Sequence, residues 1–365
     1  FEENERALLL CRRLGLRHVP LHEHFFTPEG LKKYDLLPTG PHSVGRNFAK
    51  YNSGQGDSAE ALKQAVQAEV AAVASQARHF NETTYYYGGE WGLSESSQYA
   101  PWPAYTGDGD RPVDDAARRN AERHVRIFTA IGRALREQFP RTKLMLQWGA
   151  PAGTLVYLRA GMPRDLVDGF ALDAPMFELL PEVSNVTGSI NSLWMVREEA
   201  RRLGWPRLPM SWCEGPFFPT NPGALSERAQ MDYQVRYLLL GMAYGVEEFR
   251  SGIVPQDAGN YYGAEHYGAG IIHRTPLDHP KPAVAAVATM TSMLCGFETV
   301  GGIDTGRLTT YCLEFRRPRD GAKVYALWRV TGVVQARVKV RGTQGTITDA
   351  MGNAASVAAP GGILP

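Results

Sequence analysis

The stretch LPMSWCEGPFFP, residues 208–219, ends an apolar run on a single carboxylate, Glu214. A glycine and two prolines follow within five residues, which indicates that the strand stops there. A carboxylate at the edge of an apolar interior needs a partner or a chemical role, because burying an unpaired charge is costly. A second β-prone run, TTYYYGGEW, ends in the same way on Glu90, with Glu95 close behind. Such a pair of carboxylates is suited to acid–base and nucleophilic chemistry.

Other polar side chains stand at the ends of further predicted strands. They are His22, Glu23, His24, Gln147, Trp148, Asp173, Trp212 and Arg250. Aromatic residues are frequent in the same segments: Trp91, Tyr99, Trp102, Phe217 and Phe218. Carboxylates and amides bind hydroxyl groups, and the apolar face of a sugar ring stacks on aromatic rings. The combination favours a carbohydrate substrate.

An alternation of helices and short apolar runs must position these residues. The strand-like runs are 17–25, 83–91, 142–151, 167–175, 207–215 and 246–253. Helical patterns cover 3–15, 57–80, 113–139, 191–205, 226–245 and 281–297. Apolar strands that alternate with helices predict an α/β protein with a parallel sheet covered by helices. The regular rhythm favours a (β/α)8 TIM-type barrel over a doubly wound sheet, because no G-x-G-x-x-G follows a strand.

Only six of the eight barrel strands are visible in the sequence. We expect the first two to lie upstream of residue 1, unless the barrel is incomplete. From about residue 308 the pattern changes to alternating strands separated by turn residues, which predicts a small antiparallel β-sandwich. The expected domains are therefore a barrel over 1–305 and a sandwich-like domain over 306–365. The long segments 27–54 and 255–270 are interpreted as loops that set specificity.

The composition is that of a globular protein of 365 residues, with 44% hydrophobic and 21% charged residues. The net charge of +1 gives no field that would attract nucleic acid or a membrane, so neither is expected as a partner. The four cysteines are widely spaced and are interpreted as free thiols. No apolar run is long enough to span a bilayer. An assembly of identical chains is compatible with the sequence.

The cellular compartment of the protein can be inferred from the sequence only through indirect signals. No signal peptide is visible, but the chain begins with Phe1 and not with an initiator methionine. Asn81 and Asn185 stand in glycosylation triplets, which also occur by chance. We expect a secreted or periplasmic protein and leave a cytoplasmic one open.

Two strand-end glutamates that face each other are what retaining glycoside hydrolysis requires. Glu214 is then the nucleophile and Glu90 the acid/base, with Glu95 as the alternative acid. His22, His24, Gln147, Trp148, Asp173, Trp212 and Arg250 are expected to line the subsite, and Trp91, Tyr99, Trp102, Phe217 and Phe218 its walls. This mechanism needs no metal and no organic cofactor.

The sequence also resembles glycoside hydrolase clan A. Gly89-Glu90-Trp91-Gly92 is similar to the Asn-Glu-Tyr-Gly signature of β-galactosidase-like members, and HPKPAVAAV is similar to the start of the last barrel helix in members with a β-sandwich. The resemblance implies a TIM barrel with the acid/base glutamate ending the fourth strand and the nucleophile ending the seventh. The clan has Asn before its acid/base, whereas this chain has Gly89 before Glu90 and Ser94 before Glu95.

Two other classes of function remain open. His22-x-His24 at a strand end is typical of metal-dependent amidohydrolases, but the later strands end in Gln147, Asp173 and Arg250, so the expected ligands are missing. A carbohydrate-binding or scaffold protein would keep the aromatic residues and lose the carboxylate pair. The sugar, the linkage and the choice between exo and endo cleavage have no signal in the sequence.

Overall fold

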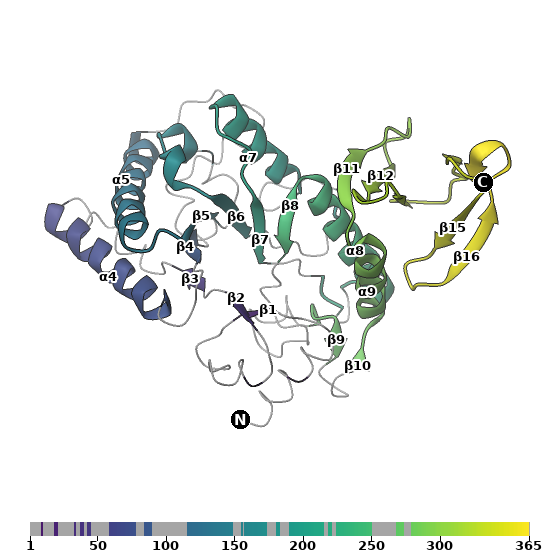
Figure 1. Cartoon of the computed structure of the whole chain (residues 1–365), viewed down its shortest axis with the longest axis horizontal. Coiled ribbons are helices and arrows are strands. Elements are labelled where there is room, and N and C mark those ends of the chain that lie inside the picture. The colour runs from purple at the N-terminus through teal and green to yellow at the C-terminus, as the bar shows by residue number, and fades with distance from the viewer. Residues whose placement is uncertain are drawn as a thin grey trace. The chain divides into compact units, whose positions relative to one another are not determined.

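The structure of the chain is a computed structural model (Figure 1). It describes residues 9, 18–20, 33, 37–39, 42–44, 58–77, 84–89, 115–148, 155, 157–173, 180–182, 190–214, 218–220, 224–249, 268–273 and 279–364. The chain divides into two compact units. The first comprises Phe1–Asp173 and Met195–Met210, and the second comprises Ala174–Trp194 and Ser211–Pro365.

The first unit alternates strands with helices. Its strands are β1 (His18–Pro20), β2 (Leu37–Thr39), β3 (His42–Val44), β4 (Thr84–Gly89), β5 (Lys143–Trp148) and β6 (Gly169–Asp173). Its helices are α4 (Ala59–Ala77) and α5 (Asp115–Gln138), with a short 3₁₀ turn at Arg164–Leu166. Helix α7 (Ile190–Arg202) and strand β7 (Met210–Glu214) each lie across the boundary between the units.

Strands β3 to β6 pair in parallel and in chain order. At the start of β7, the amide of Phe170 in β6 donates to the carbonyl of Pro209 at 3.0 Å. In the second unit, β8 (Val246–Phe249) is the neighbour of β7. Within each unit, the strands therefore follow the order of the sequence, from β3 to β6 in the first and from β7 to β8 in the second. The separate pair β1–β2 is also parallel.

Helix α5 packs on the sheet through one apolar stripe. In α5 the buried residues Ile127, Phe128, Ile131 and Leu135 recur at the spacing of a helical turn. Helices α4 and α5 lie side by side (Figure 1). The stripe explains why this segment forms a helix although it carries many charges.

The second unit contains the two helices that follow β7 and β8. These are α8 (Glu227–Ala243) and α9 (Pro282–Leu294), which pack on each other. The side chain of Ser226 caps α8 by accepting a hydrogen bond from the amide of Ala229 at 3.1 Å. Lys281 is the N-cap residue of α9 and Pro282 occupies its first turn. The short strands β9 (Ile272–His273) and β10 (His279–Pro280) lie between α8 and α9 in the sequence. They form an antiparallel pair.

The C-terminal part of the second unit is antiparallel. Strands β11 (Glu298–Gly302), β12 (Thr310–Arg316) and β13 (Lys323–Arg329) form one sheet. Strand β14 (Val338–Lys339) pairs with β17 (Ile363–Leu364), and β15 (Gln344–Thr348) pairs with β16 (Ala354–Ala358), with a 3₁₀ turn at Pro360–Gly362. Leu313 and Phe315 of β12 share an apolar cluster with Leu239 of α8 and Leu294 of α9.

The predicted α/β class with a parallel sheet is confirmed, and each of the strands β4 to β8 lies within one of the five strand-like runs expected from residue 83 onwards. One difference lies in the segment 27–54, which was expected to be a loop: it contains β2 and β3, and β3 is the strand next to β4. Each has only three residues, with Pro or Gly close by, so neither gives a periodic signal. The closed barrel, the sandwich and the domain boundary at 305/306 stay predictions.

Candidate active site at the strand ends

The carboxyl ends of β4, β5 and β6 lie at one level because the strands pair in register. Gly89 at the end of β4 is opposite Trp148 at the end of β5, and Trp148 is opposite Leu172 in β6. Asp173, the last residue of β6, follows directly. Glu90 is the residue after Gly89 in the sequence. The strand ends thus supply adjacent starting points for polar side chains, as the sequence predicts.

Side-chain alternation divides this part of the sheet into two faces. Tyr87 of β4 contacts His124 of α5, and Phe170 of β6 packs on Trp205, which follows α7. These two side chains therefore belong to the face that the helices cover. Successive side chains of a strand point to opposite faces, so the residues next to Tyr87 in β4 and next to Phe170 in β6 belong to the opposite face.

On the opposite face, Met145 of β5 lies over Gly169 of β6. A Cβ atom at position 169 would come within 2.6 Å of the Met145 side chain, so a larger residue would displace it. Gln147 stands two residues further along β5 and is 8% exposed. Gln147 is therefore the predicted subsite residue whose side chain the structure places on the face away from the helices.

The helix-covered face contains a buried polar contact. The hydroxyl of Tyr87 donates to the carbonyl oxygen of His124 at 3.1 Å and lies 3.0 Å from its Nδ1. Burial, together with a smaller effect of the charge of neighbouring Arg123, lowers the pKa of His124 to about 3. His124 is therefore neutral at physiological pH. On α4, burial raises the pKa of Glu69, and a hydrogen bond from Tyr85 opposes this rise.

In the second unit, Glu214 is the last residue of β7, as predicted. Two residues earlier, Trp212 is fully buried, and its ring centre lies 4.6 Å from that of Tyr237 in α8. Ser211, the residue before Trp212 in β7, donates to a carboxylate oxygen of Glu248 in β8 at 2.9 Å. Trp212, which the sequence suggested as a sugar-binding residue, therefore packs between β7 and α8.

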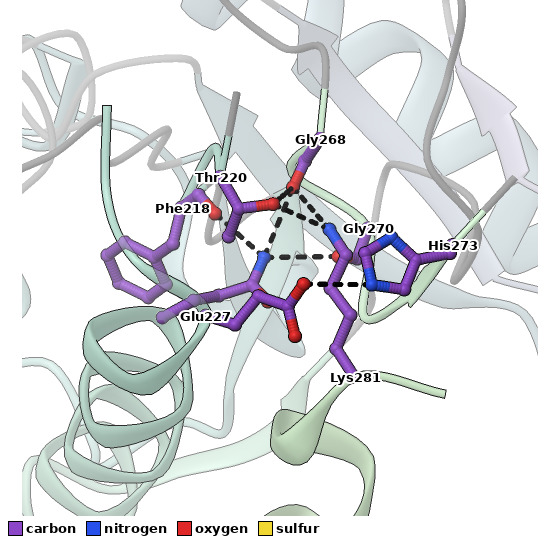
Figure 2. A network of polar contacts seen from close by, with 8 residues as sticks. Phe218, Thr220, Glu227, Gly268, Gly270, His273 and Lys281 are labelled. Atoms are coloured by element: carbon purple, nitrogen blue, oxygen red, sulfur yellow. Dashed lines mark hydrogen bonds and ion pairs between the residues drawn. The ribbon is translucent and has the colours of Figure 1, made fainter. Parts of the chain in front are cut away.

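Phe218 and Thr220, four and six residues after Glu214 in the sequence, belong to a polar network (Figure 2). Gln230 of α8 donates to the carbonyl oxygen of Phe218 at 2.8 Å. Lys281 is 1% exposed, and its Nζ donates to the hydroxyl of Thr220 at 2.9 Å and to the carbonyl oxygen of Gly268 at 2.7 Å. Next to this network, Nε2 of His273 lies 2.9 Å from a carboxylate oxygen of Glu227.

Sequence reasoning did not assign a role to Gln230 or Lys281. The Pro280-Lys281-Pro282 triplet predicts only the start of the last helix. A lysine fixed between two prolines at a helix start is the signal that could have drawn attention to it. Gln230 lies in the helix expected over 226–245 and has no distinguishing signal there.

Several predicted site residues fall outside the described residues: His22, Glu23, His24, Glu90, Trp91, Glu95, Tyr99, Trp102, Phe217 and Arg250. For Trp148, Asp173 and Glu214, the structure describes the strand position and not the side chain. Within the described ranges there is no group of three or more His, Cys, Asp or Glu residues that could hold a metal ion. In the same ranges, no helix combines the length and apolar character needed to cross a membrane.

The fold of the chain is similar to that of a known class of enzymes. Its elements follow those of glycoside hydrolases of known structure, so the predicted resemblance to that class is confirmed at the level of the fold. A scan of protein-family models and a search of curated proteins gave no match.

Particular solved structures define the likeness. One is a family 39 glycoside hydrolase from the gut symbiont Bacteroides cellulosilyticus, with 15% identity and a TM-score of 0.61 over 97% of this chain and 76% of that one. Another is β-glucuronidase 2 from Bacteroides uniformis, solved with a covalently bound cyclophellitol-6-carboxylate aziridine, with 12% identity and a TM-score of 0.51. It matches over 97% of this chain and 42% of its own length.

Proposed function

We propose that the chain is a retaining glycoside hydrolase that acts on an oligo- or polysaccharide. The observation that carries this proposal is the coincidence of a glycoside hydrolase fold with acidic residues at, or directly after, the ends of three parallel strands. In parallel α/β sheets the substrate binds at the carboxyl ends of the strands. Glu214 ends β7, Asp173 ends β6, and Glu90 follows β4 in the sequence.

The proposed reaction proceeds by two displacements. A carboxylate oxygen of Glu214 attacks the anomeric carbon while Glu90 gives its proton to the leaving oxygen, so the glycosidic bond breaks as the glycosyl–enzyme ester forms. Glu90, now ionised, takes a proton from water, and the water oxygen displaces Glu214 from the anomeric carbon. Atoms and charges balance with water as the only co-substrate. No cofactor takes part.

The remaining residues receive supporting roles. Gln147, on the face of β5 away from the helices, would bind a sugar hydroxyl through its amide. Trp212 would hold β7 against α8 and not contact sugar, because it is fully buried against Tyr237. We retain sugar-binding roles for the other predicted subsite residues: His22, His24, Trp91, Trp102, Trp148, Asp173, Phe217 and Arg250.

A panel of aryl glycosides tests the proposal through two variants. Glu214→Ala should lose turnover on every substrate that the wild type accepts, and azide should restore it. Because azide then replaces the nucleophile in a single displacement, the glycosyl azide should have the inverted anomeric configuration. The matched control is Glu198→Gln, an exposed glutamate of α7 paired with Arg201, which should keep wild-type rates.

The acid/base assignment is tested by leaving-group dependence. Glu90→Ala should reduce turnover about 10²–10⁴-fold on substrates with basic leaving groups and much less on dinitrophenyl glycosides, whose leaving group needs no proton. If Glu95→Ala shows this pattern instead, Glu95 is the acid. Turnover that survives in both Glu214→Ala and the double variant of residues 90 and 95 would contradict the mechanism. Sugar binding by a wild type that turns over no glycoside would favour a binding protein.

A further inference from the structure

The three residues Phe218–Thr220 are fixed at every position. The carbonyl of Phe218 accepts a hydrogen bond from Gln230, and the carbonyl of Pro219 accepts one from the amide of Leu225 at 3.0 Å. Thr220 donates to the carbonyl of Gly268 twice, from its amide at 3.1 Å and from its hydroxyl at 3.0 Å. This segment begins four residues after Glu214 in the sequence.

The same helix holds the chain before and after Glu214. Trp212 packs edge-on against Tyr237 of α8 with ring centres 4.6 Å apart. Phe218 packs against Tyr237 at 6.0 Å and against Tyr233, one turn earlier, at 5.6 Å. One tyrosine of α8, Tyr237, thus contacts a buried aromatic residue on each side of Glu214 in the sequence, Trp212 before it and Phe218 after it.

Lys281 is the charged residue at the centre of the polar network around Thr220 and Gly268 (Figure 2). It comes from the start of α9, where its own amide donates to the carbonyl of Ile271 at 2.9 Å. Its ammonium reaches the Thr220 hydroxyl and the Gly268 carbonyl, so one cation joins α9, the loop at 268–271 and the segment after β7. Hydrogen bonds from a charged donor are stronger than those between neutral groups.

Two features show that the network is built for this geometry. Gly268 has a backbone φ of +78°, a conformation that other residues adopt only at a cost, so its carbonyl is aimed by a position that favours glycine. Gln230 is 0% exposed, and its Nε2 lies within 3.4 Å of the carbonyl oxygens of Phe218, Gly268, Ala269 and Gly270. A buried lysine and glutamine are costly unless such partners are present.

We infer that Lys281 is a positioning residue: through Thr220 and Gly268 it holds the segment Phe218–Thr220, and with it the end of β7 that carries Glu214. The catalytic consequence rests on the proposed function, whereas the holding of the segment does not. A displacement of about 1 Å in a reacting group lowers rates by about a hundredfold, so loss of this support should reduce kcat.

The structural part is tested by amide hydrogen exchange in the full chain. Lys281→Met keeps most of the side-chain length and removes the donors. We expect exchange of the Thr220 amide to rise at least tenfold, while amides in β12 and β13 keep wild-type protection. The control Lys323→Met removes an exposed lysine of β13 and should leave Thr220 unchanged. Wild-type protection of Thr220 in Lys281→Met would overturn the inference.

The catalytic part is measured on the aryl glycoside that the wild type cleaves fastest. Active sites are counted by mass after labelling with a 2-deoxy-2-fluoro analogue of that glycoside, so misfolded protein does not lower the apparent rate. We expect kcat per labelled site to fall about tenfold to a hundredfold in Lys281→Met, with KM changed less than threefold. A purely structural lysine would reduce the number of sites and leave kcat per site unchanged, which would overturn the positioning role.

A milder variant covers the case in which Lys281→Met does not fold. Thr220→Val removes the hydroxyl that links the ammonium to the segment and keeps the side-chain shape. It should show the same effects at smaller size, and wild-type exchange and kcat in this variant would again overturn the inference. If the wild type cleaves no glycoside, the proposed function fails, and the exchange of Thr220 still decides whether Lys281 holds the segment.

Discussion

At the scale of single residues, Trp212 and Lys281 are both buried by contacts with residues that are distant in the sequence. Glu214 and Asp173 end β7 and β6, as the apolar runs before them predict. Trp212 looks the same as a substrate-binding aromatic in the sequence, yet it is buried against Tyr237. Lys281 looks like a solvated lysine, yet it is 1% exposed. The difference depends on neighbours that are distant in the sequence, so no local pattern reports it.

His124 gives a prediction of how stability changes with pH. The unfolded chain binds a proton to this histidine near pH 6.5, whereas the folded chain does so only near pH 3. Below pH 6.5 protonation therefore favours the unfolded state, by up to about 1.4 kcal/mol for each pH unit. Between pH 6.5 and 5 we expect the wild type to lose about 2 kcal/mol more stability than His124→Asn.

Urea unfolding at pH 7, 6 and 5 measures this difference. Asn can still accept a hydrogen bond from Tyr87, so the variant isolates the effect of protonation. The control His279→Asn replaces an exposed histidine and should follow the wild type. Equal losses of stability in the wild type and His124→Asn would show that His124 does not resist protonation in the folded state.

At the scale of elements, the length of an apolar or amphipathic run decides what can be predicted. The long helices α4, α5, α8 and α9 have enough turns to show their periodic pattern, and each lies where it is expected. The three-residue strands β2 and β3 have no such pattern, and only their pairing with other strands defines them. The attachment of the C-terminal sheet to α8 is likewise invisible in the sequence.

That attachment includes a buried ion pair in the second unit. The carboxylate of Glu182 binds the guanidinium of Arg236 in α8 through two contacts and accepts a hydrogen bond from Nε1 of Trp328 in β13 at 2.7 Å. The side chain of Glu182 is 3% exposed and that of Arg236 is 10% exposed. The pair thus joins the segment after β6, the helix α8 and the antiparallel sheet.

We expect Glu182→Gln to lower the free energy of unfolding by about 3–5 kcal/mol, because it leaves a buried guanidinium without its counter-charge. The double variant Glu182→Gln with Arg236→Met should lose less, because no buried charge remains. As a control, Glu314→Gln breaks the more exposed pair with Lys323 and should cost less than about 1 kcal/mol. Unfolding in urea measures all three, and a double variant less stable than the single one would contradict this explanation.

At the scale of the whole molecule, the chain combines a fold with a set of acidic residues that come from distant parts of the sequence. Within the first unit, parallel pairing in chain order brings the ends of β4, β5 and β6 together, although 58 residues lie between the first residues of β4 and β5. Alternation of helices and strands predicts this order, because right-handed connections through helices place consecutive strands side by side. No such rule predicts the conformation of loops. Because loops set the specificity, the sequence does not identify the substrate.

The choice between a two-carboxylate hydrolase and a metal-dependent amidohydrolase gives a prediction for the whole protein. In the first mechanism, Glu214 supplies the nucleophile and Glu90 the proton, so no Lewis acid is needed. We therefore expect that dialysis against EDTA leaves kcat/KM on the best aryl glycoside within about twofold of its starting value. In a metallohydrolase the metal generates the attacking hydroxide, so its removal should abolish turnover and Zn²⁺ should restore it. Loss and recovery of this kind, together with loss of activity in His22→Ala, would replace the glycosidase proposal by the metal-dependent one.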